Sequence, residues 1–263
     1  GSMLGDVTAK LALDVGEIVY NKKAIRNAVV ELDARGGAVA VPKLSATLPG
    51  DMVLQAKSTM TGDAAKPSVT GEFSLVGPKL RETLNWLEVD TASVPASKLQ
   101  KLSLKGRMAS SGGNVQVSDA VFELDDLKGN GGVVVTFGVP LSIVTSLNID
   151  TLDLDSFLVP AAAQKPAASA QAASPSAPSG QKPAAGPSIG LKAKVAKLIY
   201  NKETIQGVDV DVALQGSTLR LNDVKVSNVG GGRFAVRGTV ANYSAPQPRP
   251  DIAFNFEAPD MGR

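Results

Sequence analysis

The sequence contains no histidine and no cysteine among its 263 residues, and aromatic side chains make up only 4% of it. Without cysteine the chain cannot form a disulfide, a thiolate nucleophile or a cysteine-bound zinc site. Without histidine it lacks the commonest general base and the commonest metal ligand of proteins. The formal net charge of +2 provides no general attraction to nucleic acid or to anionic membranes. We therefore predict a protein that is not an enzyme, with no catalytic residue, no metal ligand, no cofactor and no nucleic-acid partner.

Long hydrophobic runs are missing as well. No window of 18 residues is apolar throughout, so the sequence predicts no membrane-spanning helix. Residues 1–3, Gly-Ser-Met, have the sequence of a scar left by tag removal, and we exclude them from the fold. We expect the chain to be a piece of a longer protein whose targeting or anchoring segment lies elsewhere.

Residues 160–188 differ in composition from everything around them. This stretch is dominated by alanine, proline and serine, and its only charges are Lys165 and Lys182. Such a segment cannot bury enough apolar surface to offset the entropy lost on ordering, so we predict a flexible linker. It divides the chain into a first β block, residues 4–159, and a second β block, residues 189–263.

The two blocks resemble each other in sequence. The segment Ile-Val-Tyr-Asn-Lys at residues 18–22 corresponds to Leu-Ile-Tyr-Asn-Lys at residues 198–202. The same offset of 180 positions, without a gap, aligns Ile25 with Ile205 and Val30 with Val210. This indicates one β unit used more than once. The second block could continue the sheet of the first or form a separate unit, and both possibilities stay open.

Alternation of apolar and polar residues is the main structural signal. Val208, Val210 and Val212 alternate with Asp209 and Asp211, the period expected of a strand with one apolar face. Similar patterns recur along both blocks between turn residues, which predicts a mainly β fold of antiparallel strands.

One segment has a helical period instead. Residues 78–87 carry apolar side chains at i, i+4 and i+7 behind a proline, which predicts a short amphipathic helix near Leu80–Leu87. We expect Trp86 to fill the space between this helix and the sheet, with a membrane-interface or partner contact as the alternative.

A long one-sided sheet must cover its apolar face, and one short helix cannot do so. Either the sheet folds on itself as a sandwich or barrel, or another molecule fills a concave face. The alternating apolar side chains are mostly aliphatic, which suits acyl chains as well as self-packing. The residues that we assign to this face are Val30, Val39, Val41, Leu102, Leu104, Val115, Val117, Val208, Val210, Val212, Leu219, Leu221, Phe234, Phe254 and Phe256.

Several polar clusters could carry chemistry but have simpler interpretations. Asp150, Asp153 and Asp155 could bind Ca²⁺, but the solvated face of a strand is the interpretation that we favour. Asp125 and Asp126 predict a turn rather than a pair of ligands.

Glycine clusters and two turn lysines are interpreted in the same way. The clusters at residues 129–132 and 230–232 predict turns or bulges, because neither opens a helix as a phosphate-binding loop does. Lys22 and Lys202 lie in the repeated Tyr-Asn-Lys, where solvated turn lysines are expected. A contact with lipid headgroups is the alternative.

Three segments together resemble a known family. Residues 102–107 (LSLKGR), 113–119 (GNVQVSD) and 147–155 (LNIDTLDLD) are similar to recurrent runs of the AsmA-like proteins, and residues 191–240 resemble their β unit. The resemblance implies a repeat-built, curved, taco-like β-groove with an aliphatic interior. It further implies a periplasmic protein anchored in the inner membrane of a Gram-negative bacterium that carries phospholipid or another lipid between the two membranes.

Taken with the alternation, this resemblance gives our functional expectation. The apolar positions named above would hold acyl chains in a non-enzymatic, periplasmic lipid-transfer segment. The alternative is a structural or assembly module, a β-sandwich-like scaffold for outer-membrane protein biogenesis whose edge strands pair with outer-membrane or other envelope proteins.

Overall fold

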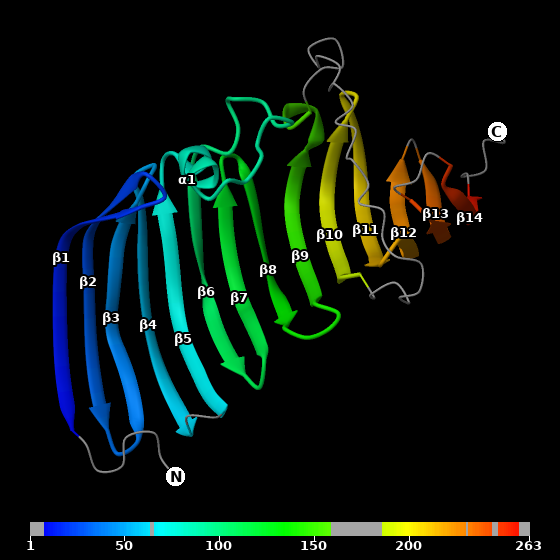
Figure 1. Ribbon diagram of the computed structural model, residues 1–263. Helices are drawn as coiled ribbons and strands as arrows, with labels where there is room; N and C mark the ends of the chain where they lie inside the picture. Colours follow the sequence, from blue (N-terminus) through cyan, green and yellow to red (C-terminus); the bar gives the residue numbers. More distant parts are fainter. Residues whose placement is uncertain (1–7, 64–65, 159–185, 230, 244–246, 258–263) are drawn as a thin grey trace, which may run out of the picture.

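The computed structural model describes residues 8–63, 66–158, 186–229, 231–243 and 247–257. Within them the predicted fold class is confirmed: the chain is mainly β, with one long curved sheet of 14 strands and one α-helix (Figure 1). No second sheet packs on this one in the described residues, so the sandwich and the closed barrel are not formed. The predicted tag scar and residues 160–185 of the predicted linker lie outside the described residues.

The strands follow one another in the sheet in the order of the sequence. Their length, about ten residues or more in nearly every case, reflects the long alternating stretches between turn residues. The elements are β1 (Ala9–Tyr20), β2 (Lys23–Arg35), β3 (Ala38–Leu48), β4 (Met52–Asp63), β5 (Lys66–Gly77), α1 (Leu80–Trp86), β6 (Leu102–Ser111), β7 (Asn114–Leu124), β8 (Leu127–Thr136), β9 (Ser142–Asp153), a 3₁₀ turn η1 (Leu154–Ser156), β10 (Ser188–Tyr200), β11 (Glu203–Gln215), β12 (Thr218–Val229), β13 (Gly232–Ala241) and β14 (Arg249–Glu257).

One pairing departs from the predicted antiparallel pattern. β9 and β10 run parallel, with Ser142 opposite Ser188 and Leu152 opposite Leu198. A parallel pair needs a crossover connection of a dozen or more residues, and residues 154–187 supply it. The two sequence blocks therefore meet along this pair and form one continuous sheet.

The sequence repeat has a counterpart in the backbone. The turn between β1 and β2 holds Asn21 and Lys22 at φ +46° and +63°, and the turn between β10 and β11 holds Asn201 and Lys202 at +51° and +65°. Positive φ at both central residues is typical of a type I′ turn, which favours asparagine at the first of them. Corresponding sequences thus form corresponding hairpins.

The predicted helix is also present, as α1. Trp86 is 7% exposed, and its Nε1 donates a hydrogen bond of 2.9 Å to the carbonyl of Tyr20. The two rings meet edge to face with their centroids 5.9 Å apart. The Nδ2 of Asn21 donates to the carbonyl of Trp86 at 2.6 Å, so α1 is fixed to the first hairpin of the sheet.

The loop that follows α1 is tied down by two charged side chains. The Arg81 guanidinium donates hydrogen bonds to the carbonyls of Thr91, Val94 and Pro95 at 2.6–3.1 Å. The Asp125 carboxylate accepts from three successive backbone N–H groups, those of residues 99–101. Asp125 lies in the turn between β7 and β8, as predicted. Together α1 and residues 87–101, here called the cap, form a cover held at both ends.

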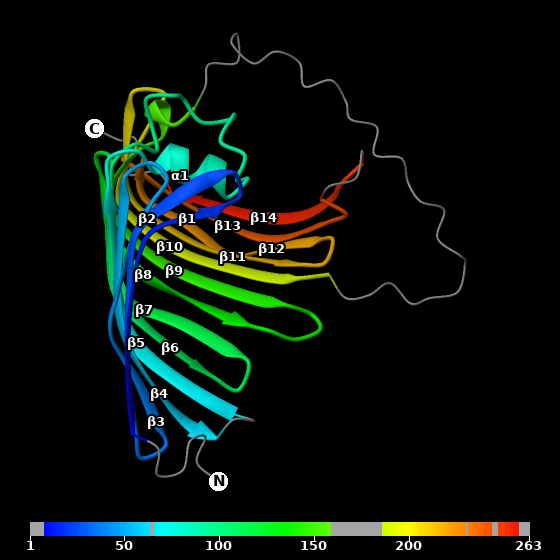
Figure 2. The same ribbon diagram turned by 60° about the vertical axis from the view of Figure 1, so that its left-hand side comes forward.

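The cap lies inside the curve of the sheet (Figure 2). Met52, at the start of β4, is fully buried. The cap packs beside this side chain, since the Thr83 hydroxyl of α1 donates a hydrogen bond to the carbonyl of Pro49 in the preceding turn. The face that carries Met52 is therefore the concave face, and the cap closes one end of it.

The glycines at residues 129–132 do not form a chain reversal, one of the two possibilities that the sequence predicts, but a bulge is present beside them: the register with β7 shifts between Val117 and Ala120, opposite Gly131 and Val133. These glycines lie inside β8, paired with β7 on one side and β9 on the other. A Cβ built on Gly129 would lie 2.6 Å from the Phe122 ring of the neighbouring strand. Glycine at this position makes room for an aromatic ring rather than for a chain reversal.

Candidate functional site

The concave face of the sheet is apolar along its whole length. Residues directly opposite each other on neighbouring strands share a face, so the strand register traces it from one edge to the other. One row of directly paired residues runs Leu104, Phe122, Gly129, Ile149, Val195, Val208, Val226, Phe234 and Phe256. This row crosses from β6 to β14 and passes over the parallel pair without a break in its apolar character.

The register places all the residues that we assigned to the apolar face on this one concave side. Val30 pairs with Leu44, and Val39 with Met60, at the β1 end of the sheet. The remaining predicted members from both blocks lie in the same or adjacent rows, namely Val41, Leu102, Leu104, Val115, Val117, Val208, Val210, Val212, Leu219, Leu221, Phe234, Phe254 and Phe256.

Other members of the face were missed by the sequence analysis. They include Leu32, Leu44, Leu54, Phe73, Leu75 and Phe122 in the first block, and Val195 in the second. Alternation is present around most of them. Bulges in β2, β3 and β7 shift its phase, however, and a phase shift hides which residues share a face.

Little covers this face. In the described residues only seven apolar side chains are buried, and two of those belong to α1. Most concave-face side chains are half-buried, screened by their neighbours but not by a second layer. At the β14 edge Phe254 and Phe256 are 76% and 58% exposed. An exposed apolar surface of this extent is typical of a binding surface.

The few aromatic rings on the face are accommodated by glycines. A Cβ on Gly106 would lie 3.4 Å from the Phe73 ring, and one on Gly232 would lie 2.9 Å from the Phe256 ring. Phe122 and Gly129 form a third pair of the same kind. Each ring occupies space that a side chain of the next strand would otherwise fill. Glycine thus makes room for three of the phenylalanines on this face, whereas Phe254 at the β14 edge is 76% exposed.

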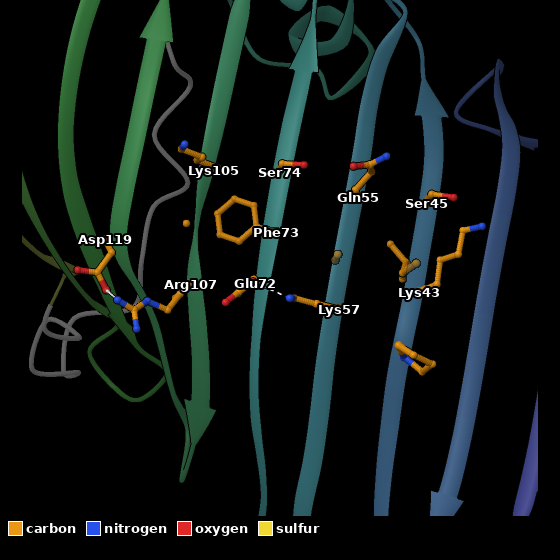
Figure 3. Close-up of a pocket in the computed structure, with 14 residues that line it drawn as sticks. Lys43, Ser45, Gln55, Lys57, Glu72, Phe73, Ser74, Lys105, Arg107 and Asp119 are labelled. Atoms are coloured by element: carbon orange, nitrogen blue, oxygen red, sulfur yellow. Dashed lines mark ion pairs between the residues drawn. The ribbon is translucent and has the colours of Figure 1, made fainter.

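The opposite, convex face is polar. A cavity of about 620 Å³ over β3–β7 is bordered by two rows of polar side chains that project to this side (Figure 3). Lys57 and Glu72 form an ion pair of 3.0 Å there, and Arg107 and Asp119 one of 2.8 Å. These four charges pair at exposed positions, as is common on a solvated surface. Lys43 and Lys105 line the same cavity.

Two of the three candidate aspartates, Asp153 and Asp155, form structural hydrogen bonds. The Asp155 carboxylate accepts hydrogen bonds of 2.8 Å from the backbone N–H groups of both Asn201 and Lys202. Asp153 accepts from the backbone N–H of Ser156 at 3.3 Å and begins η1. Asp155 thus binds the turn that carries the second Tyr-Asn-Lys and connects the two repeats.

Lys22 and Lys202 lie in exposed hairpin turns, at the end of the sheet where the cap lies. The structure describes no helix long and apolar enough to cross a bilayer. Comparison of the chain with protein-family models, with curated proteins and with solved structures found no match.

Proposed function

We propose that the concave face binds the acyl chains of phospholipid or another membrane lipid, in a non-enzymatic, AsmA-like lipid-transfer protein of the periplasm. One observation carries the proposal: an apolar face continues through 14 strands with no second layer over it in the described residues. The resemblance of residues 102–107, 113–119 and 147–155 to the AsmA-like proteins supports the same conclusion.

The dimensions of the face suit chains of this kind. Fourteen strands spaced about 4.8 Å apart extend about 60 Å across the sheet. One leaflet of a bilayer core is about 15 Å thick. Several acyl chains can therefore lie on the face at once, or one lipid can occupy successive positions along it.

Acyl burial is the source of affinity in this proposal. Each CH₂ group removed from water contributes about 0.8 kcal/mol. The ion pairs of the polar face are on the other side of the sheet and cannot hold a headgroup over the concave face. The face offers aliphatic contacts without a pattern of hydrogen-bonding groups, so we expect little selection among lipid headgroups.

Lipid extraction and native mass spectrometry of the purified protein test the proposal. We expect phospholipid to copurify with the wild-type chain and to be lost from the variants Val210→Asp and Phe254→Asp, which place a carboxylate on the concave face. The matched control is Val134→Asp, because Val134 is on the polar face of β8.

Circular dichroism separates loss of binding from loss of fold. Phe254 is 76% exposed on the edge strand, so its replacement should leave the sheet intact. A wild-type protein free of lipid, or equal lipid loss in folded Val134→Asp and Phe254→Asp, would contradict the proposal.

A further inference from the structure

The parallel pair β9–β10 shows how one repeat joins the next. β9 pairs with β10 on the side opposite β11, from Ser142–Ser188 to Asp153–Ile199. The chain then turns through η1, and the Asp155 carboxylate binds the backbone N–H groups of Asn201 and Lys202 in the turn at the end of β10. The junction thus has two parts, a parallel strand and an aspartate on the hairpin turn.

β1 is the counterpart of β10. Its hairpin turn has the same sequence and the same pair of positive φ angles, at Asn21 and Lys22. The bulge also recurs, with Asn27 at φ +52° where Gly207 has φ +63°. In the part of the chain that the structure describes, however, β1 pairs only with β2. Within those residues no side-chain oxygen accepts from the backbone N–H groups of Asn21 and Lys22.

We propose that the outer edge of β1 is a docking site for a further repeat unit of this type. The docking strand runs parallel to β1, with an aliphatic residue at every second position toward the concave face. In this chain Asp155 follows Leu152, the last paired leucine of β9, by three residues. The docking strand carries an aspartate at the same spacing, and its carboxylate binds the N–H groups of Asn21 and Lys22. Docking would extend the apolar face, and it does not depend on what that face carries.

Two other arrangements fit the structure less well. A second copy of the chain cannot supply its β9, which is already paired with its own β10. It could offer its β14 edge, whose described residues end at Glu257 with no aspartate beyond the last phenylalanine. The other free edge, β14, corresponds by sequence to β5, whose outer neighbour β6 is antiparallel and follows α1. By this correspondence the edge of β14 is not the counterpart of the edge of β10 that receives β9.

A peptide with the sequence of residues 142–158 tests the proposal on the full chain. Trp86 is the only tryptophan and accepts a hydrogen bond from Asn21, so its fluorescence reports on this turn. Hydrogen exchange reports on the strand. We expect the peptide to change the Trp86 emission and to protect amides of β1, including those of Asn21 and Lys22.

The matched control is the same peptide with Asp155→Asn. It keeps the strand but loses the charge that strengthens two hydrogen bonds, so we expect binding about tenfold weaker. Equal affinity of the two peptides would overturn the proposal. So would protection confined to β14, exchange of the peptide with β9 at the edge of β10, or protection of β1 by self-association of the protein alone.

Discussion

At the scale of single residues, Asp51 shows how one carboxylate holds several elements together. It lies in the turn between β3 and β4, where it accepts a hydrogen bond of 2.7 Å from Arg26 of β2. Lys79, just before α1, lies 3.4 Å from its other oxygen. The Arg26 hydrogen bond, followed by that of Lys79, lowers the pKa of Asp51 below its ordinary value. The start of the cap is thus fixed by an ion pair that acid should weaken.

This lowered pKa gives a prediction with a definite sign. A carboxyl whose pKa is depressed on folding stabilises the fold fully above its unfolded pKa, about 3.9, and the contribution is lost as pH falls through the lower folded pKa. We expect Asp51→Asn to lower the melting temperature slightly and by a constant amount at pH 5–8. Below pH 3.9 this difference from wild type should shrink.

Asp14→Asn is the control, because Asp14 is exposed on β1 and forms no ion pair within the described residues. Its effect should stay small at every pH. Salt should reduce the Asp51 effect, since both partners are exposed. A melting difference for Asp51→Asn that is unchanged at pH 2 would show that the ion pair is not its cause.

At the scale of strands, the glycine–phenylalanine pairs explain how neighbouring strands approach on the concave face. Gly129→Ala should destabilise the fold by about 1–3 kcal/mol, because the new Cβ would press on the Phe122 ring and on the Asn148 carbonyl oxygen, each 2.6 Å away. Denaturant unfolding measures the change. Gly16→Ala is the matched control, since a Cβ there meets nothing within 4 Å and should cost almost nothing.

A double variant identifies the cause of the Gly129 effect. Phe122→Leu replaces the ring with a smaller side chain. In the Gly129→Ala background it should recover part of the lost free energy of unfolding, which would show that the two sites are coupled. The recovery should be partial because the Asn148 carbonyl oxygen remains in place. Strictly additive losses would mean that the ring does not determine the need for glycine.

These pairs also show where sequence reasoning succeeds and fails. Alternation around Val208–Val212 identifies the strand and its apolar face. Pro78 and the helical spacing of the apolar residues after it identify α1, because these signals are local. At Gly129–Gly132 the local signal predicts a turn or a bulge, and it does not reveal that these residues lie inside a strand. Phe122, which makes glycine suitable there, is a neighbour across the sheet and becomes visible only once the register is known.

Two larger features could not be predicted from the sequence either. The parallel pairing of β9 with β10 follows a stretch without hydrophobic periodicity, so nothing local fixes the direction in which the next strand runs. Whether the sheet would fold on itself was equally open, because half-buried aliphatic side chains suit a sandwich and an uncovered groove alike. The resemblance to the AsmA-like proteins favoured the groove before the single layer was known.

At the scale of the whole molecule, the sheet extends strand by strand in the order of the sequence. Within the residues that the structure describes, each strand pairs only with the strands before and after it. The concave face is continuous because each register preserves it. Among the described strands, β9 and β10 are the one neighbouring pair that runs parallel. This pair depends on a connection long enough to return the chain to the other end of the sheet.

The parallel pairing sets a minimum length for this connection, and deletions can test it. Ser188 lies opposite Ser142, so the start of β10 is about 36 Å from Asp153, the length of 11 residues of strand. Deleting residues 163–178 leaves 18 connecting residues, which reach up to about 65 Å. Deleting residues 160–185 leaves eight, which reach about 30 Å at most, and η1 shortens that reach further.

We therefore expect the shorter deletion to keep wild-type hydrogen-exchange protection in β9 and β10. The longer deletion should lose protection at this pair while the hairpins of β1–β5 stay protected, because each repeat is stabilised mainly by its neighbours. Both variants remove residues of similar composition, so composition alone cannot explain a difference between them. If the longer deletion retained full protection in β9 and β10, the parallel pairing would be wrong, because eight residues can join these strands only as an antiparallel hairpin.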